Sequence, residues 1–165
     1  SYAQQAVQLY FNGCVANGAD EGKITAWAQE AKMQALSADE IQKWGFEPGV
    51  RKAWGGHSPN GGRFLLAAGG QYCSVKARVA DEAIVRREFM RLAEAGGGGL
   101  HAEPRGDLHT DAPFSLSQLA YAWNSEGSAN EWMLTATTSS AAEAPMQAAL
   151  NVYVVPREIT RAISN

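Results

Sequence analysis

The N-terminal part of the chain carries hydrophobic residues at helical spacing. The first stripe, with members at i, i+4, i+7 and i+8, consists of Val7, Phe11, Cys14 and Val15. This spacing predicts a helix with one buried face, which ends at Gly18. Asp20 is a suitable N-cap for a second helix. Its stripe consists of Ile24, Trp27, Ala28 and Ala31.

A third, short helix is predicted by its end signals. Ser37 and Glu40 form an S-x-x-E capping box, in which each side chain bonds the backbone of the other residue. Gly45 suits the left-handed stop of a helix that ends at Trp44. Residues 46–62 then read as a long loop rich in Gly and Pro, which includes Trp54 and His57.

Alternation of period two begins after this segment. Residues 63–68 and 71–79 predict two strands joined by a tight turn at Gly69-Gly70. The alternation of the second strand is clear, because polar and apolar residues point to opposite faces. The apolar set is Cys73, Val75, Ala77 and Val79, and the polar set is Tyr72, Ser74, Lys76 and Arg78.

The second half of the chain predicts one helix and three more strands. Asp81 can cap a helix that ends at the glycines of residues 96–99, and residues 100–113 read as a polar loop. The apolar face of this helix consists of Val85, Phe89, Leu92 and Ala93. The strands are expected at residues 114–124, 131–138 and 147–155, with a turn at 125–130 and a helical turn at 157–163.

This order of elements predicts an α+β domain. N-terminal helices precede a ββαβββ arrangement, and a mostly antiparallel sheet with helices on one face is the natural solution. We find no internal repeat and no domain boundary, so residues 1–165 are expected to form a single domain.

Composition narrows the function classes. The net charge of −3 and the absence of any Lys/Arg run give no electrostatic case for nucleic-acid binding. No apolar stretch approaches the roughly 18–20 residues of a membrane-spanning helix. The chain opens at Ser1 without an initiator Met, and we expect that a targeting segment has been removed. A soluble, exported protein fits these features.

The two cysteines lie on elements whose apolar faces must both be buried. Cys14 is on the stripe of the first helix and Cys73 is on the apolar face of the second predicted strand. A helix packed on the sheet would bring them together, and a disulfide would close a loop of about 60 residues and stabilise the fold by about 4 kcal/mol. Such a bond would place the protein in the periplasm or outside the cell. The alternative is two reduced core cysteines that never meet.

No catalytic residue is predicted. Ser58 follows His57 but lacks the context of a nucleophile elbow. His101 and His109 lie in an acidic segment whose spacing matches no recognised metal-ligand motif. We expect this segment to be a solvated polar loop. We therefore expect no cofactor and no metal.

Three hypotheses of different classes follow. The first is a non-catalytic binding protein of the cell envelope, for instance an inhibitor or immunity-type protein that masks a toxin or hydrolase. Its candidate partner-binding residues are Trp54, His57 and Arg63, because aromatic and Arg side chains dominate protein interfaces. The alternatives are a small-molecule sensor, by a loose likeness to PAS or profilin domains, and a hydrolase or metal enzyme that uses His57, His101 and His109.

The order of the cysteine motifs carries a resemblance. Gly61-Gly62-Arg63-Phe64 and Gln71-Tyr72-Cys73-Ser74-Val75, after a helical Cys14, resemble small uncharacterised exported proteobacterial proteins over about the first 95 residues. The resemblance implies a periplasmic or lipoprotein location and brings no catalytic residues.

Overall fold

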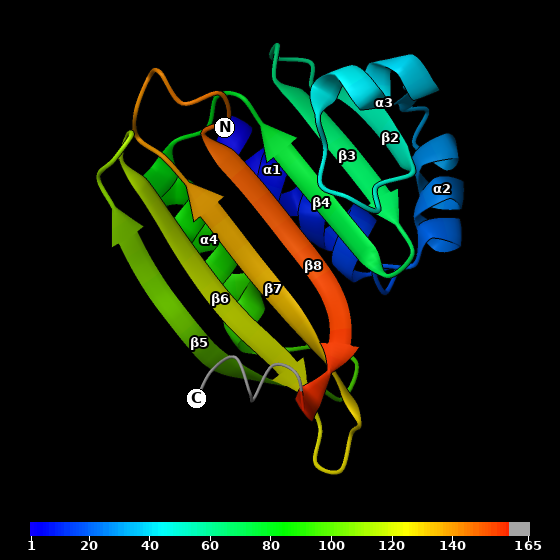
Figure 1. Cartoon of the computed structure of the whole chain (residues 1–165), viewed down its shortest axis with the longest axis vertical. Coiled ribbons are helices and arrows are strands. Elements are labelled where there is room, and N and C mark those ends of the chain that lie inside the picture. The colour runs from blue at the N-terminus through cyan, green and yellow to red at the C-terminus, as the bar shows by residue number, and fades with distance from the viewer. Residues whose placement is uncertain (159–165) are drawn as a thin grey trace.

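The computed structural model describes residues 1–158, and one antiparallel sheet of eight strands organises them in the order β1-β2-β3-β4-β8-β7-β6-β5 (Figure 1). The helical elements are α1 (Tyr2–Leu9), η1 (Tyr10–Val15), α2 (Glu21–Glu30), α3 (Ala38–Trp44) and α4 (Glu82–Ala95). The strands are β1 (Gln34–Ala35), β2 (Lys52–His57), β3 (Arg63–Gly69), β4 (Tyr72–Ala77), β5 (His101–Thr110), β6 (Leu116–Asn124), β7 (Asn130–Thr138) and β8 (Ala148–Pro156). The predicted α+β class is confirmed.

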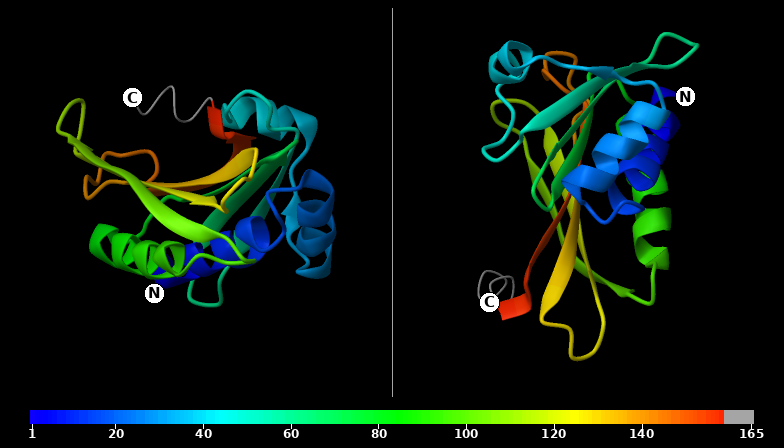
Figure 2. Two further views of the ribbon diagram at one scale, coloured as in Figure 1. Left: turned by 90° about the horizontal axis from the view of Figure 1, so that it is seen from below. Right: turned by 90° about the vertical axis from the view of Figure 1, so that its right-hand side faces the viewer.

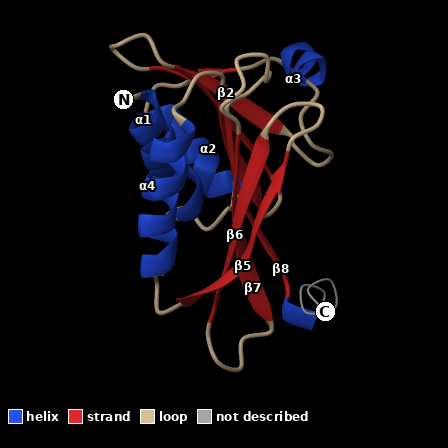
Figure 3. Cartoon of the chain, turned by 90° about the vertical axis from the view of Figure 1, so that its left-hand side faces the viewer, coloured by secondary structure: helices blue, strands red, loops and turns tan. Residues whose placement is uncertain are grey.

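The sheet is curved, and most of the helices lie on one of its faces. Figure 2 shows α1 and α4 beneath the curved strands, and Figure 3 shows α1, α2 and α4 together on one side of the sheet. Helix α3 is the exception, because it lies on the opposite side, beside β2 (Figure 3). We call the side without α1 and α4 the open face.

The N-terminal helix predicted from the first hydrophobic stripe is confirmed, with a change of helical type at its end. Ser1 caps α1 through a capping box with Gln4. The chain then continues as the π-helical segment η1, in which the Ala16 N–H bonds the Phe11 carbonyl 2.9 Å away. The wider turn includes both Tyr10 and Cys14, which are completely buried.

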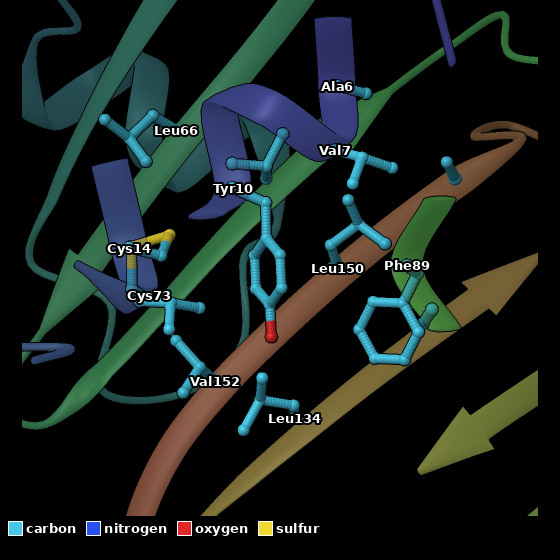
Figure 4. Packing of buried hydrophobic residues seen from close by; sticks show 14 of the residues in the cluster. Ala6, Val7, Tyr10, Cys14, Leu66, Cys73, Phe89, Leu134, Leu150 and Val152 are labelled. Atoms are coloured by element: carbon cyan, nitrogen blue, oxygen red, sulfur yellow. A yellow bond between two sulfur atoms is a disulfide. The ribbon is translucent and has the colours of Figure 1, made fainter. Parts of the chain in front are cut away.

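An aromatic cluster fills the space between this helical segment and the sheet. Figure 4 shows Tyr10 pointing between β4 and β8 among apolar side chains. Its hydroxyl donates to the Asn151 carbonyl of β8 at 2.6 Å. Burial raises the pKa of Tyr10 well above its ordinary value, so the phenol stays a donor. Phe89 of α4 and Phe11 pack beside the Tyr10 ring.

The predicted disulfide is confirmed. Cys14 of η1 and Cys73 of β4 are bonded, with Cα atoms 5.4 Å apart and both residues fully buried (Figure 4). The bridge links the helical layer to the central part of the sheet. No free cysteine exists in the described chain.

Several elements follow the sequence pattern closely. Helix α3 has the predicted capping box and ends at Gly45, whose φ of 65° is left-handed. The β3–β4 hairpin has its two-residue turn at Gly70-Gln71, one position later than predicted, and the φ of Gly70 is 60°. Helix α4 is capped by Asp81 and ends at Gly96, and β6, β7 and β8 form the predicted C-terminal meander.

The prediction of a loop over residues 46–62 is wrong in part, because β2 occupies Lys52–His57. Gly55 and Gly56 lower the intrinsic strand propensity and hide the alternation. Nevertheless, all six residues of β2 pair with β3, from Lys52↔Ala68 to His57↔Arg63. Tertiary pairing therefore overrides the local glycine signal here.

The prediction of a loop over residues 100–113 is also wrong, because β5 runs from His101 to Thr110 and pairs with β6. This edge strand is largely exposed, so its sequence shows no apolar alternation. Charged residues, together with a bulge between Pro104 and Gly106, are typical of an edge strand. Polarity alone cannot separate such a strand from a loop.

The helical turn predicted at residues 157–163 lies mostly outside the described residues. Within residues 1–158, no helix combines the length and the apolar character needed to cross a membrane.

Removal of the disulfide tests its contribution to stability. We expect the double variant Cys14→Ala/Cys73→Ala to lose up to about 4 kcal/mol of unfolding free energy, because the bridge closes a long loop in the unfolded chain. Urea unfolding followed by circular dichroism measures the loss. An unchanged midpoint in the double variant would contradict this role.

The Tyr10 hydroxyl gives a second stability test. Tyr10→Phe leaves the Asn151 carbonyl without its buried donor, and we expect a loss of about 1–2 kcal/mol in urea unfolding. Tyr153→Phe is the matched control, because its hydroxyl makes no hydrogen bond in the described structure. The control should change stability by less than about 0.5 kcal/mol. Equal effects of the two substitutions would refute the assignment.

Candidate functional site

A groove of about 790 Å³ lies on the open face of the sheet, at the end where β3 begins and β4 ends. Trp44 of α3 lines one wall, Leu65 of β3 lies in the floor, and Met146 of the loop 139–147 lines the other wall. We call it the α3 groove. It lies across the sheet from α1 and α4, so it shares β3 and β4 with the core but uses their other face.

The α3 wall is formed by a short helix that buries none of its residues fully. Just before it, the Leu36 N–H bonds the Ala53 carbonyl of β2 at 2.9 Å and fixes the helix to the sheet edge. The Glu40 carboxylate accepts the Ser37 N–H at 2.9 Å, and this hydrogen bond lowers the pKa of Glu40. Trp44 remains 51% exposed at the groove.

The opposite wall is held by Gln147. Its N–H bonds the carbonyls of Ala77 and Arg78 at the end of β4, and its side-chain oxygen accepts the Ala80 N–H at 3.0 Å. The Ser139 N–H bonds the Gln147 carbonyl and closes the loop at its base. These hydrogen bonds hold the segment that carries Met146 to the end of β4.

The floor consists of two cross-strand rows. In one row, the register brings Gly55, Leu65 and Lys76 side by side. Gly55 leaves the floor open, since a Cβ added there would meet no atom within 4 Å. The absence of a side chain at this position contributes directly to the depth of the groove.

The positive charge of Lys76 is paired with a carboxylate within the protein. Its Nζ lies 3.0 Å from the Glu47 carboxylate and 5.1 Å from the centre of the Phe46 ring. Burial by itself raises the pKa of Glu47, but hydrogen bonds from its own N–H and from Lys76 outweigh burial and set this pKa below the ordinary value. The pair connects the segment after α3 to the floor.

The second row carries positive charge. His57 pairs with Arg63, and Arg63 and Arg78 each stand one position beyond the paired Phe64 and Ala77. The register therefore places His57 beside Arg63, Arg78 directly follows the end of β4, and all three line the groove. Within residues 1–158 their side chains make no hydrogen bond or ion pair.

The groove also gathers exposed apolar side chains. The most exposed large hydrophobic residues of the described chain are Trp44 at 51%, Val79 at 57% and Leu108 at 65%. Two of the three, Trp44 and Val79, line the α3 groove. Clusters of exposed apolar residues beside charged ones are typical of interaction sites.

The structure places two of the three candidate binding residues at the groove and the third in the core. His57 and Arg63 line the groove, whereas Trp54 is only 4% exposed and belongs to the hydrophobic core. Trp54 is thus not at the groove surface, and Trp44 is the tryptophan that is. Arg78 and Val79 were not predicted as site residues. The prediction that Val79 continues the apolar face of the strand is wrong, because β4 ends at Ala77 and Val79 is 57% exposed at the groove.

The histidine-bearing segment has local partners. In β5, His109 lies 2.9 Å from Asp111 and 3.0 Å from Ser117. Asp107 pairs with Arg86 of α4. Among the described residues, no group of three or more His, Cys, Asp or Glu side chains could hold a metal ion.

Ser58 takes part in its own turn. The Gly62 N–H donates to the Ser58 hydroxyl at 2.8 Å, and this hydroxyl also bonds the Asn60 side chain. Both contacts stabilise the β2–β3 turn.

Comparison with known proteins provides no neighbour for this chain. No family model, no curated protein and no solved structure matches it. The resemblance to exported proteobacterial proteins stays a prediction.

The Glu47–Lys76 pair makes a prediction about pH. Because folding lowers the pKa of Glu47, its contribution is present above the ordinary Glu pKa and is lost as pH falls through the folded value. We expect Glu47→Gln to lose less than about 1 kcal/mol at pH 7, since the carboxylate is partly exposed, and the gap to narrow at pH 3, below the ordinary Glu pKa. Urea unfolding at both pH values measures this gap.

The control for this comparison is Glu126→Gln. Glu126 lies in the β6–β7 turn and makes no ion pair in the part of the chain that the structure describes. This variant should follow the wild type at both pH values. A gap for Glu47→Gln that persists unchanged at pH 3 would argue against the ionic contribution.

Proposed function

We propose that this protein is a non-catalytic binding protein of the cell envelope that receives a segment of a partner protein in the α3 groove. An inhibitor or immunity-type protein that masks a toxin or hydrolase is the concrete form of this proposal. The observation that carries it is the coincidence, in one groove, of Trp44 and Val79 with the cations Arg63 and Arg78.

The composition of the groove supports binding of a protein. Protein interfaces are enriched in aromatic residues and Arg, and their central anchors lie next to polar groups. Trp44 and Val79 offer apolar contact area, and Arg63 and Arg78 offer donors that are not engaged within residues 1–158. A partner that covers this surface removes the apolar side chains from water and supplies acceptors to the unpaired cations. Both changes favour binding.

The chemistry of the groove gives less support to catalysis. A general base acts best when a second group orients it, and a nucleophile needs that base within hydrogen-bond reach. His57 has no orienting partner in the described structure, and the Ser58 hydroxyl is engaged in the β2–β3 turn. These features favour recognition over turnover.

The disulfide supports the proposed location in the cell envelope. Structural disulfides persist in oxidising compartments and are rare in the reducing cytosol. Cys14 and Cys73 are fully buried and bonded, which fits a protein that folds in the periplasm or after secretion. The proposed partner is therefore sought in the envelope.

The size of the groove favours one second candidate, a small-molecule sensor. Its volume of about 790 Å³ falls inside the range of ligand pockets, about 300–1,000 Å³. A ligand that survives purification would appear as an added mass in native mass spectrometry. If a substitution that fills the groove removes this added mass, the result favours a sensor over a protein that binds a protein partner.

A substitution that fills the groove tests the proposal. Gly55→Val introduces a side chain into open space at the floor, in a strand where a β-branched residue is well tolerated. Gly106→Val is the matched control, because Gly106 lies in β5 and its added Cβ also meets no atom within 4 Å. Both variants should keep the unfolding free energy within about 0.5 kcal/mol of the wild type or above it.

The binding experiment compares these variants as immobilised full chains in an envelope extract of the source organism. We expect one protein to be retained by the wild type and by Gly106→Val and to be lost with Gly55→Val, and the same dependence to hold with the purified pair. If every captured protein binds Gly55→Val as well as the wild type, or if none is captured, the proposal is wrong.

A further inference from the structure

The floor of the α3 groove has a charge imbalance that the protein does not correct. His57 and Arg63 are paired on β2 and β3, Arg78 directly follows the end of β4, and all three line the groove. Like charges directly opposite each other destabilise a sheet. In the adjacent row Lys76 is paired with Glu47, but Arg63 and Arg78 have no carboxylate partner within residues 1–158. An anion from outside would relieve this repulsion.

Apolar groups lie on both sides of the cationic row. Trp44 is on the α3 wall, Leu65 is in the neighbouring row of the floor, and Val79 directly follows Arg78. A ligand that places only a charge over the row would leave Trp44 and Val79 exposed to water. The complementary ligand therefore combines an anionic group with an apolar group beside it.

The backbone at the sheet edge indicates that this ligand is a polypeptide. Strand β1 pairs only with Trp54 and Gly55 of β2, so β1 does not cover the outer edge of β2 at His57. Gly56 and His57 line the groove, and an extended chain can add to such an edge through main-chain hydrogen bonds. An extended peptide matches both the donor and the acceptor of this edge, whereas a small organic anion offers acceptors alone.

The walls of the groove limit how much negative charge the ligand carries. Glu40 lies on the α3 wall and Glu143 on the opposite wall. A run of acidic residues would bring carboxylates close to both, and like charges at an interface discriminate against wrong partners. One or two acidic residues over the row satisfy Arg63 and Arg78 without this repulsion.

We propose, on the basis of the proposed function, that the partner segment is an extended peptide in which an Asp or Glu side chain contacts Arg63 and Arg78 and a neighbouring aromatic or aliphatic side chain packs on Trp44 and Val79. The carboxylate accepts charge-assisted hydrogen bonds from the two guanidinium groups. The apolar side chain covers the exposed rim of the groove.

Selection from a displayed library of random peptides of about twelve residues, long enough to cross the groove as a strand, tests this inference. We expect selection on the full-length protein to enrich Asp or Glu next to an aromatic or aliphatic residue. The best peptide should bind Arg63→Gln/Arg78→Gln at least about tenfold more weakly and should weaken with added salt. Arg87→Gln/Arg91→Gln, on exposed positions of α4, is the control and should bind as the wild type does.

The possible outcomes separate this inference from the proposed function. Enriched peptides without acidic residues, bound equally by Arg63→Gln/Arg78→Gln but lost with Gly55→Val, would overturn the acidic-segment inference and leave the groove as a protein-binding site. Peptides bound equally by Gly55→Val, or no enrichment at all, would overturn both. Urea unfolding of each Arg variant verifies that the loss of binding is not a loss of fold.

Discussion

The pairing of β4 with β8 is the interaction on which the rest of the structure depends. It is the single seam between the β1–β4 and β5–β8 parts of the sheet in the described chain. The same helical segment reinforces both sides of this seam, because Cys14 is bonded to Cys73 of β4 and the Tyr10 hydroxyl donates to Asn151 of β8. A covalent bond and a buried hydrogen bond therefore join the two halves of the sheet to one helix.

The strand that carries the disulfide also carries the floor of the α3 groove. Cys73, Val75 and Ala77 face the helices and are fully buried, while Lys76 within β4 and Arg78 directly after it line the groove. Because successive residues of a strand point to opposite faces, a shift of register would move both sets at once. The buried bridge thus positions the floor of the groove indirectly, by fixing the strand that carries Lys76 and leads into Arg78.

Sequence patterns predicted the elements whose signals are local, and missed those whose signals are tertiary. The capping box of α3, the β3–β4 turn and the disulfide follow from spacing and from matching of apolar faces. Strand β2 was hidden by its glycines, and this error placed Trp54 in a loop when its side chain is in the core. The groove could be predicted only in part, since Arg78 and Trp44 meet there only after α3 packs over the open face.

The two edges of the sheet are treated differently, and this difference explains why the groove lies at the β2 end. Strand β5 carries charged side chains, Pro104 and a bulge, which discourage pairing with another chain, and its exposed Leu108 lies between polar neighbours. The β2 edge has only the two-residue β1 and ends in Gly56 and His57. Natural sheets protect edges that have no partner. The β2 edge lacks such protection and lies next to unpaired cations and exposed apolar groups, and for this reason we propose that a partner covers it.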